Sequence, residues 1–254
     1  MRNDGRAADQ LRPISITRKF TQTPAGSVLW QQGKTVVLCT ASVALEVPRW
    51  FKEDRAGGWV TAEYVMLPAS TPQRKPWPKM GSTDSRGTEI QRMIGRCLRA
   101  AMDMTRIGPH TLTVDCQVLQ ADGGTRTACI SAAYVALRDA IATLPAKMPP
   151  PPAPSRSDPS LYDPGAALAD AVAAVSVGLV GGTPLLDLDY ADDSRAEVDL
   201  NVAYTAAGKF VEIQGCAENG RGFDRKQMNQ LLDLAVAGCA KIMGEQKRAL
   251  EIPV

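Results

Sequence analysis

Residues 111–141 read TLTVDCQVLQADGGTRTACISAAYVALRDAI and contain the change of pattern on which the fold depends. Apolar and polar side chains alternate over residues 111–119, which is typical of a strand with one buried face. From about residue 127 to about residue 143 the apolar side chains recur at helical spacing. Two glycines, two threonines and an arginine lie between the two patterns. The stretch therefore predicts a strand that turns sharply into a helix.

This strand-to-helix corner has two explanations. A helix beginning leaves backbone N–H groups without partners and carries partial positive charge, so it can bind an anion. Gly124 permits a close backbone approach, Thr125 adds a hydroxyl, and Arg126 adds a forked cation suited to phosphate. The alternative is a tight turn and a helix cap with no ligand. The corner alone does not decide between them.

A second helix beginning repeats the arrangement in DSRGTEIQR, residues 84–92. Thr88 and Gln91 fit a capping box, and Arg86 lies two residues before the expected cap. The helix that follows has one apolar face, formed by Ile90, Met93, Ile94, Cys97, Leu98 and Ala101. Two arginines, each beside a helix N-terminus, predict a cradle for one inorganic phosphate.

An acidic stretch, LLDLDYADDSRAEVDLNV at residues 185–202, offers the complementary charge. We expect Asp187 and Asp189 on the same face of a strand and Asp193 in the turn after it. Such carboxylates can hold Mg²⁺, or one of them can act as a general acid on a leaving oxygen. An acidic hairpin that faces water explains the pattern equally well.

The remaining patterns predict further strands and one long helix. Strands are expected within residues 12–20, 27–45 (a hairpin turning at Gly33), 58–68, 171–180, 183–190, 196–205 and 209–215. Asp224 and Gln227 suit the start of a final helix. Residues 145–164 hold eight of the 18 prolines and predict a linker. Strands and helices do not alternate strictly, so the expected class is α+β, with portions at 1–144 and 165–254.

Composition excludes several classes of protein. At 254 residues, 44% hydrophobic and 22% charged, the chain is typical of globular proteins. It lacks an apolar run long enough for a membrane span, and its polar N-terminus lacks a secretory signal, so we expect a cytoplasmic protein without membrane association. The six cysteines form no C-x-x-C pair and are expected in the core. His110 is the sole histidine and is expected to be structural.

The net charge of +2 hides an uneven distribution. Residues 49–99 carry ten Lys or Arg against five acidic residues, whereas residues 183–200 carry six acidic residues against one arginine. A basic and an acidic stretch in one nearly neutral chain are consistent with sites for phosphates and for a cation. The alternative is solvated faces.

Seven segments of the chain resemble the ribonuclease PH family of phosphate-dependent 3′→5′ exoribonucleases. They are GRAADQLRPISI, GSVLWQQGKTVVLCTAS, WVTAEYVMLPAST, GTEIQRMIGRCLRAA, DCQVLQADGGTRTA, LDLDYADDSRAEVDLNV and FVEIQGCAE. Two stretches, LQADGGTRTA and DLDYADDS, are specific enough to separate this family from general RNA-binding folds. The resemblance runs from end to end except at the proline-rich segment.

The resemblance implies a ribosomal protein S5 domain 2-like fold followed by a smaller exoribonuclease PH C-terminal α+β portion, assembled as a homohexamer that is a trimer of dimers. It implies that Arg86, Gly124, Thr125 and Arg126 bind the attacking phosphate. It also implies that Asp187 and Asp193 are the acidic active-site residues, linked to Mg²⁺ (or Mn²⁺) and proton transfer. The implied reaction trims tRNA precursors and other RNA 3′ ends, releases nucleoside 5′-diphosphates and is reversible.

The implied RNA contacts are less complete. Arg74, Lys75, Lys79 and Arg92 are the basic residues expected to meet RNA. Family members usually place several arginines in the loop after MLPxST, where this chain has Ala69, Arg74 and Trp77. A second hypothesis is a non-catalytic RNA-binding subunit of an exosome-like ring. The presence of both arginines and both aspartates in one chain favours the enzyme.

Overall fold

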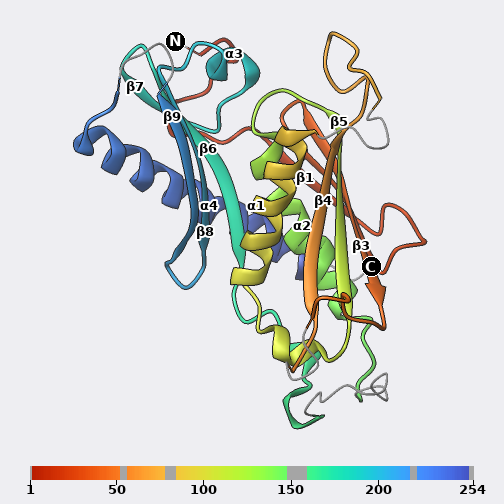
Figure 1. Cartoon of the computed structure of the whole chain (residues 1–254). Helices are drawn as coiled ribbons and strands as arrows, with labels where there is room; N and C mark the ends of the chain where they lie inside the picture. The colour runs from red at the N-terminus through yellow and green to blue at the C-terminus, as the bar shows by residue number, and fades with distance from the viewer. Residues whose placement is uncertain (1, 52–55, 78–83, 148–158, 218–221, 252–254) are drawn as a thin grey trace.

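The computed structural model describes residues 2–51, 56–77, 84–147, 159–217 and 222–251. Its elements lie in four layers: a first sheet, helices α1 and α2, a second sheet, and helix α4 (Figure 1). The first sheet has the order β1-β2-β3-β5-β4, and only its β4–β5 pair is parallel. Its strands are β1 (Ile14–Arg18), β2 (Gly26–Gln32), β3 (Thr35–Ala44), β4 (Trp59–Met66) and β5 (Thr111–Gln120).

The second sheet is antiparallel, with the order β7-β6-β8-β9. Its strands are β6 (Val172–Val180), β7 (Thr183–Leu186), β8 (Val198–Thr205) and β9 (Phe210–Ala217). Strand β6 is buried along nearly its whole length because helices cover both of its faces: α2 (Thr125–Ile141) on one and α4 (Arg225–Glu251) on the other. Its continuous apolar sequence fits this position.

Helix α2 lies between the two sheets, and every residue from Thr127 to Ile141 except Arg138 is buried. It packs on β2, β3 and β5 of the first sheet and on β6 of the second. The buried side chains of both halves therefore form one continuous core. The division into portions 1–144 and 165–254 stays a prediction, because packing does not separate them.

Both expected helices are present, but each begins earlier in the sequence than predicted. Helix α1 (Ser85–Ala100) begins one turn earlier than Thr88, because the Asp84 side chain accepts a hydrogen bond from the Gly87 N–H and caps it. Helix α2 begins at Thr125 and not near residue 127. Both shifts have a consequence for the arginines: Arg86 and Arg126 are each the second residue of their helix.

The start of α4 agrees with expectation. Asp224 and Gln227 exchange hydrogen bonds between side chain and backbone at 2.8 Å in both directions. His110 is buried, with Nδ1 2.6 Å from the Ile107 carbonyl oxygen, as a structural histidine should be. The described part of residues 145–164 contains the short 3₁₀ helix η2 (Pro159–Leu161), and a second one, η3 (Pro164–Ala166), begins at its last residue. Among the described residues, no helix is long and apolar enough to cross a membrane.

Candidate functional site

The corner between β5 and α2 has the backbone of an anion site. Gly123 and Gly124 adopt positive φ angles of 75° and 63°, which glycine tolerates best. Gly124 is the N-cap of α2, and no side chain caps the helix there. The N–H groups of the first turn have no partner within the helix itself. The helix beginning is therefore able to bind an anion through its backbone, with Thr125 and Arg126 on its first turn.

Two neighbouring residues fix the corner in this shape. The Thr35 hydroxyl accepts a hydrogen bond from the Asp122 N–H at 3.0 Å and donates one to the Gly123 carbonyl at 2.7 Å. The Arg12 guanidinium donates to the Asp122 carbonyl through Nη1 at 2.5 Å. Both side chains are buried. The corner is preorganised by the start of β3 and by the segment that precedes β1.

Tyr64 of β4 contacts the beginning of α2. Its hydroxyl lies 3.0 Å from Thr125 Oγ1. Burial raises the pKa of the Tyr64 phenol well above its ordinary value, while the hydrogen bond between Tyr64 and Thr125 and the charges of Arg86 and Arg126 act against that rise. The phenol therefore stays neutral and can donate a hydrogen bond.

Sequence patterns did not indicate the role of one further residue of this region, Gln214. Gln214 of β9 accepts a hydrogen bond from the Arg126 guanidinium and donates one to Glu89 Oε1 of α1 at 2.6 Å. Gln214 thus connects three elements that are distant in the sequence. The only available signal was the polar residue at position 214 of the alternating segment 209–215, and that signal does not specify a partner.

The acidic residues are not arranged as expected. Strand β7 ends at Leu186, so Asp187 and Asp189 do not share a strand face. Asp187 has a φ of 55°, which turns the chain out of the strand. Asp189 is the N-cap of the short helix α3 (Tyr190–Asp193) and accepts a hydrogen bond from the Asp192 N–H at 2.8 Å. Asp189 caps α3 and does not extend strand β7, because its side chain accepts a hydrogen bond from a backbone N–H of the first turn of α3.

The acidic segment nevertheless lies against the corner. The Tyr190 N–H donates to Asp122 Oδ1 at 3.3 Å. A Cβ atom added to Gly123 would lie 2.6 Å from the Leu188 carbonyl oxygen, closer than real Cβ atoms approach. Gly123 is therefore required both for its positive φ and for this contact. The structure brings the corner and the acidic segment together, as the mechanism requires.

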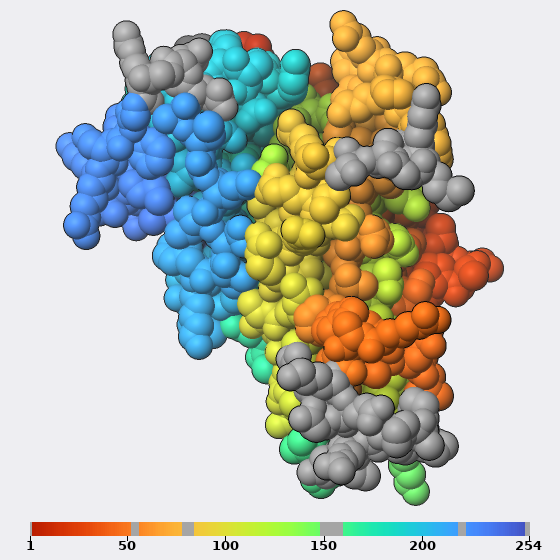
Figure 2. Space-filling model, viewed as in Figure 1, coloured from red at the N-terminus to blue at the C-terminus, as the bar shows by residue number. Residues whose placement is uncertain are grey.

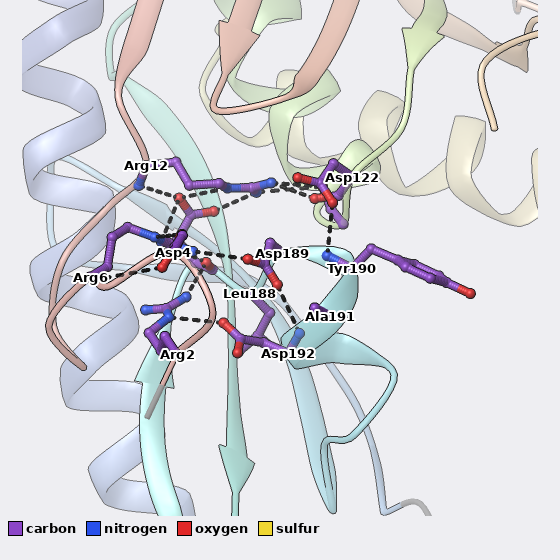
Figure 3. A network of polar contacts seen from close by, with 12 residues as sticks. Arg2, Asp4, Arg6, Arg12, Asp122, Leu188, Asp189, Tyr190, Ala191 and Asp192 are labelled. Atoms are coloured by element: carbon purple, nitrogen blue, oxygen red, sulfur yellow. Dashed lines mark hydrogen bonds and ion pairs between the residues drawn. The ribbon is translucent and has the colours of Figure 1, made fainter. Parts of the chain in front are cut away.

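Arginines of the N-terminal segment hold the acidic segment in place (Figure 3). Arg12 binds both oxygens of Asp187: Nη2 donates to Oδ1 at 2.7 Å, and the backbone N–H donates to Oδ2 at 2.7 Å. Arg2 donates to the carbonyls of Leu186 and Asp187 and forms a 2.9 Å ion pair with Asp192. Since Arg12 also binds the Asp122 carbonyl, one side chain ties the acidic segment to the corner.

Asp187 and Asp193 differ in environment. Asp187 is 1% exposed, whereas Asp193 is exposed on α3. Burial alone would raise the pKa of Asp187, but the charge of Arg12 and its hydrogen bonds lower that pKa below its usual value. Asp187 is therefore an ionised carboxylate whose oxygens are engaged by arginine. Arg12 engages both oxygens of Asp187, so Asp193 is the more accessible of the two carboxylates.

The basic residues expected to meet RNA are exposed where the structure describes them. Arg74 and Lys75 lie in the loop after β4, and Arg92 lies on the outer side of α1. Figure 2 shows this loop and α1 as neighbouring parts of one face of the molecule. Lys79 lies outside the described residues. The structure shows these side chains on the surface but does not test their contact with RNA.

Known sequences decide the family. A model described as "3′ exoribonuclease family, domain 1" matches residues 10–142, and one described as "3′ exoribonuclease family, domain 2" matches residues 170–238. This chain belongs to the 3′ exoribonuclease family. It is 52% identical over 252 residues to Ribonuclease PH of Corynebacterium efficiens, which covers 99% of the chain and 97% of that protein. It is 53% identical over the same length and coverage to Ribonuclease PH of Corynebacterium glutamicum.

Solved structures of the family share the fold. Rice Rrp46 superimposes with a TM-score of 0.77 at 19% identity and covers 99% of this chain and 100% of its own. An Archaeoglobus fulgidus exosome with RNA bound to the active site superimposes with a TM-score of 0.76 at 22% identity, covering 96% and 92%. At such low identity the likeness establishes the family's α+β architecture in this exoribonuclease and nothing finer.

Proposed function

We propose that this protein is a phosphorolytic 3′→5′ exoribonuclease that trims the 3′ ends of tRNA precursors. Inorganic phosphate is the nucleophile, nucleoside 5′-diphosphates are the products, and the reverse reaction adds nucleotides. The observation that carries the proposal is the pair of helix beginnings, each with arginine as its second residue. Gln214 bridges them through Arg126 and Glu89, and the acidic segment contacts the α2 corner. The near-complete similarity to ribonucleases PH supports it.

The phosphate site in this proposal consists of Arg86 and the corner Gly124, Thr125 and Arg126. The first-turn N–H groups of α2 and the two guanidinium groups supply donors to phosphate oxygens. The same groups offset the negative charge that develops as phosphate attacks the 3′-terminal phosphodiester. Arg126 would exchange its hydrogen bond with Gln214 for one to phosphate when the anion binds.

Asp187 and Asp193 have different roles in this proposal. Asp187 is held ionised and buried by Arg12, so we propose that it fixes the acidic segment at the reacting centre. Asp193 is exposed on the short helix that contacts the corner, so we propose that its ionised carboxylate would hold Mg²⁺ or Mn²⁺, while solvent supplies the proton to the leaving 3′ oxygen. When bound, such an ion supplies positive charge to the phosphates.

Arg74, Lys75 and Arg92 complete the proposal as contacts to the RNA backbone, together with Lys79. Phosphate contacts of this kind hold RNA without reading its sequence and weaken as salt increases. We also propose that the chain assembles as a homohexameric ring and that tRNA precursors are its substrates. Native mass measurement of the purified protein tests the ring, because a monomer or dimer contradicts it.

The deciding experiment incubates the protein with a 3′-extended tRNA and Mg²⁺, with and without inorganic phosphate. We expect shortening only with phosphate and nucleoside diphosphates among the products. Shortening at the same rate without phosphate, with release of monophosphates, would show hydrolysis and overturn the proposal. Extension of the shortened tRNA by added nucleoside diphosphates checks the reverse reaction.

A further inference from the structure

Three cysteines that are far apart in the sequence meet in the core between the first sheet and α2. Cys39 of β3 and Cys116 of β5 are direct register partners, and Cys129 lies in the second turn of α2. Their Sγ atoms all lie within 4.8 Å of one another, and all three residues are buried. Within the described part of the chain, this is the sole group of three or more metal-ligating side chains found so close together.

The geometry suits one ion bound by three sulfurs. Three sulfurs at about 2.3 Å from a common ion lie ~4 Å apart in a planar arrangement, within the spacing observed here. Among the residues that the structure describes, no carboxylate or imidazole joins the group. Zinc prefers four ligands, whereas soft thiolates without a fourth ligand select monovalent copper. We propose that Cys39, Cys116 and Cys129 form a binding site for a soft thiophilic cation of the Cu⁺ class.

The surroundings of the sulfurs agree with a monovalent ion. All three cysteines belong to the hydrophobic core, where uncompensated charge is costly. Cu⁺ brings one positive charge into this core and a divalent ion brings two, so Cu⁺ is the better fit.

The three-cysteine site lies next to residues that position the corner between β5 and α2. Tyr64, whose hydroxyl contacts Thr125, is the register partner of Cys116 on β4. Cys129 is four residues after Thr125 in α2, one turn along the helix. An ion held by the three sulfurs would join β3, β5 and α2, and would stabilise the elements that position the corner.

The test titrates the intact, reduced protein anaerobically with Cu⁺ held by a chromophoric Cu⁺ chelator. We expect one ion per chain to be withdrawn from the chelator, a rise in Tm on loading, and three sulfur neighbours in X-ray absorption. Cys129→Ser, which removes one ligand with a small change in volume, should weaken binding at least about tenfold, as loss of one thiolate ligand is worth more than 1.4 kcal/mol.

Two cysteines serve as matched controls. Cys97→Ser alters a buried cysteine outside the cluster, and Cys216→Ser alters an exposed one. Both should retain wild-type Cu⁺ affinity and the loading-dependent rise in Tm. Failure of the wild-type protein to compete with the chelator overturns the proposal. So does binding that Cys129→Ser leaves unchanged or that Cys216→Ser abolishes. Circular dichroism of each variant confirms that it is folded.

Discussion

The beginnings of α1 and α2 carry the same residue at the same place and differ in everything around it. Arg86 and Arg126 are both second residues of their helices. At α1 the Asp84 side chain already accepts a backbone N–H, and Arg86 is exposed. At α2 the cap is a left-handed glycine without a side chain, and Arg126 is partly buried against Gln214.

This difference separates two ways of binding an anion. The α2 beginning offers backbone N–H groups, a hydroxyl and a guanidinium on a corner tied down by Thr35 and Arg12. The α1 beginning offers chiefly an exposed side-chain charge, because a carboxylate already caps its first turn. We infer that α2 supplies the fixed half of the phosphate site and α1 the adjustable half.

The largest expected effect comes from the anchor of the α2 corner. Asp187→Asn leaves the buried Arg12 without its charged partner, and such a loss costs about 3–5 kcal/mol of folding free energy. Urea unfolding measures it. Asp139→Asn breaks the partly buried pair with Arg18 elsewhere in the first half and is the matched control. We expect both variants to be less stable, but only Asp187→Asn to lose phosphorolysis.

The same pair predicts a pH dependence with a definite sign. The folded pKa of Asp187 lies below its ordinary value of 3.8. The carboxylate therefore contributes its stability fully above about pH 5 and loses it as the pH falls through the folded value. Unfolding free energies measured from pH 7 downward should fall less steeply in Asp187→Asn than in the wild type. Parallel curves would contradict the assignment.

A second test breaks the contact between the corner and the acidic segment. Gly123→Ala adds a Cβ 2.6 Å from the Leu188 carbonyl oxygen at a φ of 75°, and we expect a cost of about 2–4 kcal/mol from strain and overlap. Gly182→Ala has a similar φ of 72° with nothing within 4 Å. It should show the backbone strain alone and retain activity. Equal loss of phosphorolysis in the two variants would refute the contact.

Substitution of each arginine by alanine compares the two helix beginnings directly. Arg126→Ala should raise the phosphate KM about 100-fold, as expected for loss of a charge-assisted hydrogen bond worth about 2–3 kcal/mol. Arg86→Ala, which removes an exposed charge, should raise it about tenfold. Initial rates at varied phosphate measure both, and native mass confirms unchanged assembly. A larger effect from Arg86 would reverse the assignment of fixed and adjustable halves.

The smallest effect concerns the cap of α1. Asp84→Ala removes the acceptor for the Gly87 N–H and should cost about 1 kcal/mol of stability. It also removes a negative charge near Arg86, so the phosphate KM should fall slightly or stay the same. Asp224→Ala, which removes the comparable cap of α4, is the control for helix capping without a nearby phosphate. A markedly raised KM in Asp84→Ala would mean that the cap positions Arg86.

Local patterns predicted much of this molecule because local physics determines them. Alternation in β1 to β5, the hairpin at Gly33, and the side-chain exchange between Asp224 and Gln227 depend on neighbours a few residues apart. The strand, the two glycines and the helix of residues 111–141 follow from the same short-range rules. The start of α1 was misplaced by one turn because Asp84 and Thr88 both fit a cap, and a local pattern cannot rank two caps.

Contacts between distant segments had no such signal. Arg12 binds Asp187, which is 175 residues away in the sequence, and Gln214 binds Arg126, which is 88 residues away. The three cysteines became neighbours only when β3, β5 and α2 packed together. The order of residues determined which helices and strands form and which residues stand at their ends, since backbone sterics and side-chain periodicity act over a few residues. Packing of the two sheets around α2 decided which charges and thiols meet, because burial brings together groups that the chain holds far apart.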